Sequence, residues 1–358
     1  MGRFASMFNG LAKSFSTTKK VKSNGGKETT NDMVKDAKKN DMILRSSGFT
    51  HVHNLASVCS KRGEKGVNQD CCIVWEEFGG QEDMMLCGIF DGHGSWGHYV
   101  AKRVCESLPS SLLCNWQEEM LLEASLDLQS VKKLDRFNLW KNSFVKTCAA
   151  VDRDLQNCRK FDSFHSGTTG LAVVKQGELL VIANVGDSRA VLGTTSDDGS
   201  LVPIQLTVDF KPNLPHEAER IIECKGRVFC LEDEPGVHRL WLPNEESPGL
   251  AMSRAFGDYC VKDFGLISVP QVTQTHITGK DQFIVLASDG VWDVVSNQEA
   301  VEIVSSTDDK AKAAKRLVEC AGRAWKRKRK GIACDDISAV CVFFNNSSQQ
   351  INPITTLK

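Results

Sequence analysis

Acidic residues stand at the ends of several short apolar segments. Asp91 directly follows the segment MMLCGIF, Asp289 follows FIVLAS, and Asp187 lies between LLVIANV and RAVLGT. The pair Asp335-Asp336 directly precedes ISAVCVFF. A single Asp-Gly step is most simply a turn, because Asp and Gly are favoured turn residues. Acids at the ends of several core strands indicate instead that their carboxylates meet.

Such a group of carboxylates predicts a metal site. The acids repel one another, so the arrangement persists mainly when a cation neutralises it. Oxygen ligands with no Cys or His cluster favour Mg²⁺ or Mn²⁺ over Zn²⁺. Asp70, just before CCIVW, and Asp293, four residues after Asp289, add two more acids. Two hard cations about 3.5–4 Å apart are the usual apparatus for hydrolysing phosphate esters.

A candidate proton donor lies beside the first acid, because His93 is two residues beyond Asp91. A departing alkoxide needs a proton, and an imidazole with its ordinary pKa of about 6.5 supplies one near neutral pH. Taken alone, a histidine in this position is more often a hydrogen-bonding turn residue. Both interpretations stay open on these residues.

Composition describes a soluble globular protein and excludes several classes. Of 358 residues, 41% are hydrophobic and 25% charged, and the formal net charge of −1 gives no overall attraction to nucleic acid or membrane. The 14 cysteines show no C-x-x-C spacing, and none has the Arg six positions later that a cysteine-based phosphatase needs. An aspartyl-phosphate phosphatase needs Asp-x-Asp, whereas His and Val stand two positions after Asp91 and Asp289.

Apolar segments of strand length alternate with segments of helical period. Strands are expected at 71–75, 84–90, 171–174, 179–185, 189–194, 283–288 and 337–344, and helices at 98–108, 137–156, 217–226, 297–305 and 310–325. The tight Gly186-Asp187-Ser188 step predicts that the two strands around it form an antiparallel hairpin. Paired strands with helices inserted between them favour an α+β or layered sandwich architecture.

Eight motifs occur in order over about residues 50–345. They are GEKGVNQD (63–70), GIFDGHGSWG (88–97), SGTTGLAVV (166–174), ANVGDSRAVL (183–192), LTVDFKPNLPHEAERI (206–221), GLAMSRAFGD (249–258), VLASDGVWDVVSNQEA (285–300) and CDDISAV (334–340). With them the chain resembles the metal-dependent serine/threonine protein phosphatases of type 2C, and most closely a plant subgroup. The resemblance implies an α+β fold, a four-layer α-β-β-α sandwich with two central antiparallel β-sheets flanked by helices.

The resemblance also implies roles at matching positions. Asp91 would bridge two Mg²⁺ or Mn²⁺ ions, Gly92 would offer its carbonyl, and His93 would be the general acid. Asp289 and Asp335 would complete the ligand shell of one ion. Asp187 and Asp293, together with Asp289, would hold a weaker third ion. Asp335 is preferred over Asp336 because family members that read Asp-Asn here use the first residue. The implied function is hydrolysis of phosphoserine and phosphothreonine in protein substrates by a metal-bridging hydroxide, in plant signalling.

One motif departs from the family pattern. Many members read Arg-x-x-x-Glu-Asp where this chain has Lys65, Gln69 and Asp70. Lysine is a point charge that cannot make the two-pronged phosphate contact of Arg, and glutamine offers an oxygen without charge. We expect Lys65 to contact the phosphate, Gln69 and Asp70 to belong to the metal site, and one ion to bind more weakly, with activity at millimolar Mg²⁺ or with Mn²⁺.

Charge divides the chain into a flexible basic extension (1–48), a catalytic domain (49–345) and a disordered tail (346–358). The extension has ten Lys or Arg against four acids, and Met1-Gly2-Arg3-Phe4-Ala5-Ser6 fits the N-myristoylation pattern. We expect a cytoplasmic monomer that attaches to the cytosolic face of the plasma membrane. WKRKRKG (325–331) fits a nuclear signal or nucleic-acid patch, but a solvated helix end is favoured. No nucleic-acid partner is expected, and a nuclear location stays open.

Two functions of different classes remain. The first is the phosphatase. The second is a catalytically feeble scaffold that uses the same cleft to mask phosphorylated partners, and Lys65 and Gln69 keep it open. The full set of carboxylates argues against the scaffold, because a pure binder has no need of a complete metal shell.

Overall fold

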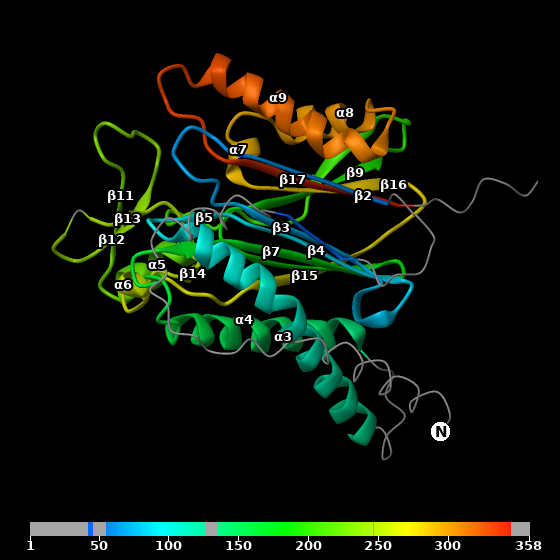
Figure 1. The fold of residues 1–358 in the computed structure, drawn as a ribbon, viewed down its shortest axis with the longest axis horizontal. Helices are drawn as coiled ribbons and strands as arrows, with labels where there is room; N and C mark the ends of the chain where they lie inside the picture. Colours follow the sequence, from blue (N-terminus) through cyan, green and yellow to red (C-terminus); the bar gives the residue numbers. More distant parts are fainter. Residues whose placement is uncertain (1–41, 46–54, 127–134, 246, 345–358) are drawn as a thin grey trace, which may run out of the picture. The chain divides into compact units, whose positions relative to one another are not determined.

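The computed structural model describes residues 42–45, 55–126, 135–245 and 247–344, the first of these as backbone only. Two large β-sheets lie at the centre of the described residues (Figure 1). One has six strands in the order β1-β3-β4-β7-β8-β15: Met42–Arg45, Cys71–Glu76, Met84–Phe90, Gly170–Gln176, Leu179–Val185 and Gln271–His276. The other has five in the order β10-β9-β16-β17-β2: Leu201–Gln205, Arg189–Thr195, Asp281–Ala287, Ile337–Phe343 and Ala56–Lys61.

Helices cover the outer face of each sheet (Figure 1). Helices α3 (Gly97–Leu126) and α4 (Arg136–Gln156) pack on the six-stranded sheet, and α8 (Asn297–Ser305) and α9 (Ala313–Lys328) pack on the five-stranded sheet. The layers run helix, sheet, sheet, helix, which confirms the predicted α+β sandwich. Every described pair of neighbouring strands in these sheets is antiparallel except β1 with β3, which is parallel. The prediction of antiparallel sheets fails only at that edge.

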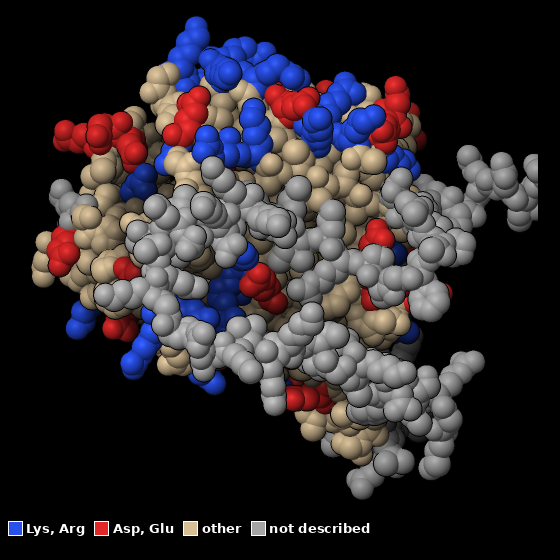
Figure 2. All heavy atoms as spheres, viewed as in Figure 1, with Lys and Arg blue, Asp and Glu red and all other residues tan. Residues whose placement is uncertain are grey.

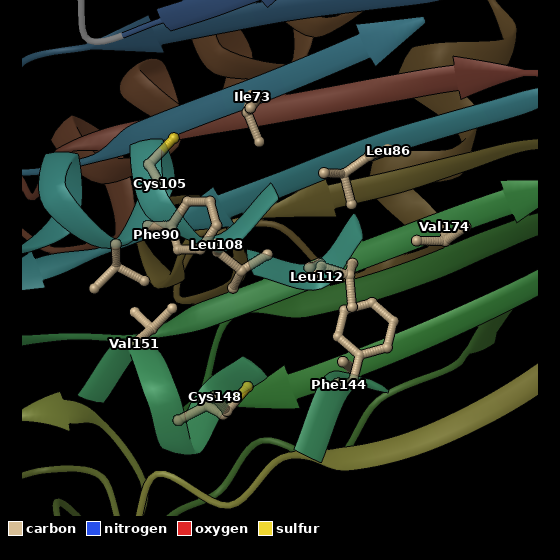
Figure 3. Packing of buried hydrophobic residues seen from close by; sticks show 14 of the residues in the cluster. Ile73, Leu86, Phe90, Cys105, Leu108, Leu112, Phe144, Cys148, Val151 and Val174 are labelled. Atoms are coloured by element: carbon tan, nitrogen blue, oxygen red, sulfur yellow. The ribbon is translucent and has the colours of Figure 1, made fainter. Parts of the chain in front are cut away.

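Three apolar layers hold the sandwich together. The layer between the sheets contains residues such as Val74, Ile182 and Leu286. Strands β4, β8 and β17 are buried on both faces, which explains why they read as unbroken apolar runs. Figure 3 shows the layer under α3 and α4, where Phe90 and Phe144 are fully buried. Burying such a side chain stabilises the folded state by about 1.5–3 kcal/mol. This packing holds the strands, and therefore their ends, in place.

The chain crosses from one sheet to the other at residues 186–188, and this corrects the predicted hairpin. β8 lies in the six-stranded sheet and β9 in the five-stranded sheet, so the two are not paired. Gly186 has a φ of 102°, and a Cβ there would lie 2.7 Å from the methyl carbon of Thr169. Glycine is needed at this step for both reasons. The crossover leaves Asp187 between the two sheets, 3% exposed.

Smaller elements surround one edge of the sandwich. Strands β5 (Gly92–His93), β6 (Gly167–Thr168) and β14 (Phe256–Gly257) form one small sheet. Strands β11 (Arg227–Phe229), β12 (Arg239–Trp241) and β13 (Gly249–Leu250) form another beside helix α5 (Pro215–Glu223). The remaining short elements are η1 (Phe78–Gly80), α6 (Tyr259–Lys262), α7 (Asp289–Trp292) and η3 (Lys310–Lys312).

Helix α9 ends in the basic run that the sequence singles out. Lys and Arg side chains gather over α9 in Figure 2. One of them, Lys328, donates from Nζ to the carbonyl of Val294 at 2.7 Å, and its neighbour Arg329 lies 3.8 Å from Asp293. Part of the run therefore connects α9 to the segment after α7.

Several predictions concern residues outside the described part. The myristoylation pattern at Gly2 and nearly all of the extension 1–48 lie there, as does the tail 346–358. Strand β1, at the end of that extension, pairs with β3. None of the described helices is long and apolar enough to cross a bilayer. The three domain boundaries stay predictions.

Candidate metal centre

The strand ends that carry the acids meet at one edge of the two sheets, beside β5 and α7 (Figure 1). β3 and β4 are antiparallel, so Asp70, before β3, lies next to Asp91, after β4. β16 and β17 are antiparallel as well, which brings Asp289 near Asp335. The hydroxyl of Ser288 donates to Oδ2 of Asp70 at 2.9 Å and joins the two sheets at this edge.

Negative charge accumulates around Asp91. The pKa of its carboxyl is raised well above the ordinary value, first by burial and then by the charges of Asp70, Asp289, Asp335 and Asp187. The pKa of Asp289 is raised in the same way, by burial and then by three neighbouring acids. Burial raises the pKa of Asp70 to about 7, and its Oδ1 is buried without a hydrogen-bond partner. Each carboxylate lies in the field of the others.

Glycines let the acidic segments approach one another. A Cβ on Gly92 would lie 2.4 Å from the carbonyl oxygen of Gly97, and one on Gly290 would lie 1.9 Å from that of Asp336. A Cβ on Gly63 would lie 2.3 Å from the carbonyl oxygen of Asp335. Real Cβ atoms do not come this close, so a side chain at any of these positions would push the segments apart.

Two lysines neutralise part of the charge. Nζ of Lys65 lies 2.5 Å from Oδ2 of Asp335, and Nζ of Lys211 is hydrogen-bonded to Oδ2 of Asp187. Among the described residues, no three His, Cys, Asp or Glu side chains already converge tightly enough to hold a metal ion. The acids are thus gathered at one edge but not drawn together around a point. The sequence predictions include Lys65 and miss Lys211, although Lys211 lies inside the motif LTVDFKPNLPHEAERI.

The adjacent acids Asp335 and Asp336 have different surroundings. Asp336 is 9% exposed, and its two carboxylate oxygens accept the backbone N–H groups of Gly63 at 2.7 Å and Gln69 at 2.8 Å. Asp335 instead reaches the acidic cluster and pairs with Lys65. Oδ1 of Asp335 accepts the backbone N–H of Asp336 at 3.0 Å, so both acids have backbone partners, and the preference for Asp335 as a ligand stays a prediction.

Gln69 and Asp293 lie at the border of the cluster. Nε2 of Gln69 donates to the carbonyl of Gly94 at 2.9 Å, and its Oε1 lies close against Gly97, 2.5 Å from where a Cβ on that glycine would be. The Asp293 side chain is 44% exposed and lies 3.8 Å from Arg329. Burial raises its pKa, with Lys211 and Arg329 opposing the change. Asp293 is therefore the least enclosed of the predicted ligands.

His93 has a carboxylate partner that the sequence predictions overlook. Nε2 of His93 lies 2.6 Å from Oδ2 of Asp258, and its Nδ1 is buried without a partner. Burial lowers the pKa of the ring, but the charge and hydrogen bond of Asp258 outweigh it and the pKa is raised. Asp258 ends the motif GLAMSRAFGD, where Gly precedes Asp as it does at Gly186-Asp187. That likeness is the signal that could have identified it.

The side chains present fit a hard divalent cation. All the candidate ligands are oxygens, and Asp91 and Asp289 are withdrawn from water among like charges, an arrangement that positive charge stabilises. The unpartnered Oδ1 of Asp70 points to the same need. Gly92 and Gln69 add uncharged oxygens beside Asp91.

Comparison with known proteins agrees with this chemistry. A family model of protein phosphatase 2C matches residues 54–326. The chain is 65% identical to probable protein phosphatase 2C 73 of Arabidopsis thaliana over 97% of this chain and 96% of that one. It is 57% identical to probable protein phosphatase 2C 48 of Oryza sativa subsp. japonica over 97% and 99%. A solved serine-threonine phosphatase 2C from Toxoplasma gondii superposes with a TM-score of 0.70 at 26% identity, covering 81% of this chain and 94% of that one.

These relatives decide between the two functions that the sequence leaves open. The family match covers most of the chain, and the plant relatives match it over nearly their full length. The enzyme is therefore favoured over the scaffold. The chain is a serine/threonine protein phosphatase that belongs to the protein phosphatase 2C family as a plant-type member.

Proposed function

We propose that the enzyme hydrolyses phosphoserine and phosphothreonine in proteins with two Mg²⁺ or Mn²⁺ ions bound at the acidic edge. Asp91, the carbonyl of Gly92, Asp289 and Asp335 would hold them. The observation that carries the proposal is the Asp91 carboxylate, which burial and four other acids place in a strongly negative environment. Hard cations prefer such oxygen ligands.

The outer residues of the edge would complete the site. Asp70 and Gln69 border the same cluster. Asp187 and Asp293, together with Asp289, would hold a weaker third ion. Weak binding there agrees with the exposure of Asp293 and with the ion pair between Asp187 and Lys211.

Side chains of the enzyme would bind the phosphate and donate the proton. Bound ions would acidify a water for attack on phosphorus and polarise the phosphoryl oxygens. The Lys65 side chain is 54% exposed at the rim of the cluster, where its ammonium can turn from Asp335 to a phosphoryl oxygen. His93 would give a proton to the oxygen of the departing serine or threonine, with Asp258 stabilising the charged ring.

Lys65 and Gln69 also explain why one ion would bind weakly. An ion at Asp335 must compete with the Lys65 ammonium for the same carboxylate. Gln69 adds an oxygen without the charge of the glutamate found in many relatives. We therefore expect half-maximal activity at millimolar Mg²⁺ and at lower Mn²⁺.

A metal-dependence assay tests the proposal. Hydrolysis of a phosphothreonine peptide would be measured with and without Mn²⁺ for the wild type, Asp91→Asn, Asp289→Asn and the control Asp197→Asn. The Asp197 side chain is 96% exposed and follows the end of β9 opposite to Asp187. Activity should require Mn²⁺, fall roughly 100-fold or more in the first two variants and stay unchanged in the control. Activity that ignores both the metal and the substitutions would refute the proposal.

We also propose a cytoplasmic, monomeric signalling enzyme attached to the inner face of the plasma membrane. The support is the Met-Gly-x-x-x-Ser start and the basic extension. A single acyl chain binds membrane only marginally, and basic residues are the usual second signal. Gly2→Ala should move the protein to the soluble fraction, and an unchanged membrane fraction would contradict this.

A further inference from the structure

One residue of helix α4, Asp152, binds the turn between β14 and α6 at several points. Its Oδ1 accepts the backbone N–H of Gly257 at 3.0 Å. Its Oδ2 accepts Nζ of Lys262 at 3.1 Å and the hydroxyl of Ser268 at 3.0 Å. Its backbone carbonyl accepts the hydroxyl of Tyr259 at 2.5 Å. A single helical residue therefore fixes residues before, within and after the turn.

The turn needs outside support because its backbone is strained. Gly257 has a φ of 78°, and Asp258 has a φ of 52° and a ψ of 46°, in the left-handed region. A residue with a side chain pays about 1–2 kcal/mol for that conformation. The small sheet offers limited support, since each of β5, β6 and β14 is two residues long. The backbone N–H of Asp258 also donates to the carbonyl of Ser166 at 3.0 Å, and Asp152 adds the side-chain contacts.

The strained turn places Asp258 against His93 across a glycine. In the small sheet Gly167 lies between His93 on one side and Gly257 on the other. A Cβ on Gly167 would lie 2.0 Å from Oδ2 of Asp258. The carboxylate thus passes over the bare Cα of Gly167 to reach Nε2 of His93 at 2.6 Å.

We propose that Asp152 is a positioning residue for the reaction, because it fixes the turn that holds Asp258 against His93 and so sets the orientation from which His93 gives its proton. This inference rests on the proposed role of His93. In that step a hydroxide derived from water forms the new P–O bond while the P–O bond to serine or threonine breaks, and the leaving oxygen takes the proton from the imidazolium. The proton that the water released when it became hydroxide restores the charged ring, so the step balances as one water consumed. Asp152 and Asp258 neither gain nor lose a proton.

Substrates with different leaving groups distinguish a loss of His93 orientation from a loss of folded enzyme. The alkoxide that departs from a phosphoserine or phosphothreonine peptide needs a proton, whereas the nitrophenolate that departs from p-nitrophenyl phosphate hardly does. Disturbing His93 should therefore reduce turnover of the peptide much more than turnover of p-nitrophenyl phosphate. A substitution that only reduces the amount of folded enzyme lowers both to the same extent.

The full-length enzyme with saturating Mn²⁺ would be assayed on both substrates. Relative to p-nitrophenyl phosphate, kcat on the phosphopeptide should fall about 100-fold in His93→Gln. It should fall about 30-fold in Asp258→Asn and about 10-fold in Asp152→Asn, with KM nearly unchanged. The double variant Asp152→Asn with Asp258→Asn should be no more selective than Asp258→Asn alone, because both act through one contact.

Glu119→Gln is the matched control. Glu119, 8% exposed on α3, also ties its helix to α4, by accepting hydrogen bonds from Lys146 and Asn142. Lys146 lies at the middle of α4 and Asn142 one turn before it, so both precede Asp152 on the helix. The control should lose stability while its activity ratio between the two substrates stays that of the wild type.

The outcomes distinguish the proposed role of His93 from the inference about Asp152. No selective loss in His93→Gln would count against the proposed role of His93 itself. A selective loss in His93→Gln with equal losses on both substrates in Asp152→Asn would overturn the inference about Asp152. If Asp152→Asn does not fold, Ser268→Ala removes only one donor to the same carboxylate and should show a selective loss of about 3-fold. An unchanged ratio there would overturn the inference as well.

Discussion

Glu217, which is buried, and Asp91, which is partly buried, are two acids in opposite electrical surroundings. Glu217 is 3% exposed, and its carboxylate receives Arg220 at 2.7 Å, Arg254 at 2.6 Å and Ser253 at 2.6 Å. Burial alone would raise its pKa, but these hydrogen bonds and charges lower it to about 2. Asp91 has acids around it instead, and its pKa is raised.

The difference shows what each acid contributes. Glu217 lies in the first turn of α5, and its partner Arg254 comes from the segment after β13, so the cluster fastens α5 to the body of the enzyme. It is complete without any ligand. The carboxylates around Asp91 repel one another and weaken the fold until positive charge arrives. A buried acid among donors stabilises the structure, whereas an acid among acids marks the place where we propose that a cation binds.

Replacing each of the two acids with its uncharged amide tests this difference most directly. Asp91→Asn should lower phosphopeptide hydrolysis roughly 100- to 1,000-fold, because it removes a ligand of the charge that stabilises the transition state. Without metal the same variant should melt at the same or a higher temperature than the wild type, because its carboxylate is disfavoured in the folded state at neutral pH. Calorimetry and the phosphopeptide assay together check this. A lower melting temperature would contradict it.

Glu217→Gln should do the reverse. The lowering of its pKa from 4.5 to about 2 corresponds to on the order of 3 kcal/mol of stability. Because the folded pKa is depressed, this stability is fully present above pH 4.5 and is lost as the pH falls toward 2. Urea unfolding should therefore give a lower free energy of unfolding for the variant than for the wild type at pH 7. The difference between the two free energies should narrow as the pH falls below 4.5. A gap that stays constant with pH would refute the assignment.

The acids of the site were predictable because each follows or precedes an unbroken apolar run. Such a run forms a strand buried on both faces, and its end must lie at a sheet edge, so Asp91, Asp289 and Asp335 were found from local pattern. The helix at 137–156 was predictable for a similar reason, since its apolar period is strong and Asp135 caps its start.

The features that the sequence does not predict depend on distant partners. Gly186-Asp187-Ser188 looks the same whether the chain turns back within a sheet or crosses to another, and the pairing of β9 with β16 decides. Lys211 and Asp258 act through side chains on segments far away, Asp187 and His93. Each lies inside an ordered motif, Lys211 in LTVDFKPNLPHEAERI and Asp258 at the end of GLAMSRAFGD, but neither motif indicates which distant side chain it contacts.

Lys65→Met sharpens the comparison by removing a cation from the acidic edge. Asp335 then loses its ion-pair partner and becomes free to bind metal. The Mg²⁺ concentration for half-maximal activity should fall several-fold, while KM for a phosphopeptide should rise about 10-fold if Lys65 contacts the phosphate. Metal titrations at several peptide concentrations measure both. The control is Lys280→Met, which breaks an exposed pair with Asp197 and should change neither quantity.

Gln69→Glu should have the smallest effect, because it adds one charge to a cluster that already holds several. The variant loses the hydrogen bond from Nε2 to the carbonyl of Gly94, so without metal it should be slightly less stable. With metal, the added carboxylate should lower the half-saturating Mg²⁺ concentration a few-fold. Gln282→Glu adds the same charge and loses a comparable hydrogen bond, to Thr195, near the opposite end of β16, which makes it the matched control. Equal metal affinity in the two variants would show that Gln69 faces no ion, and the acids alone would then account for the site.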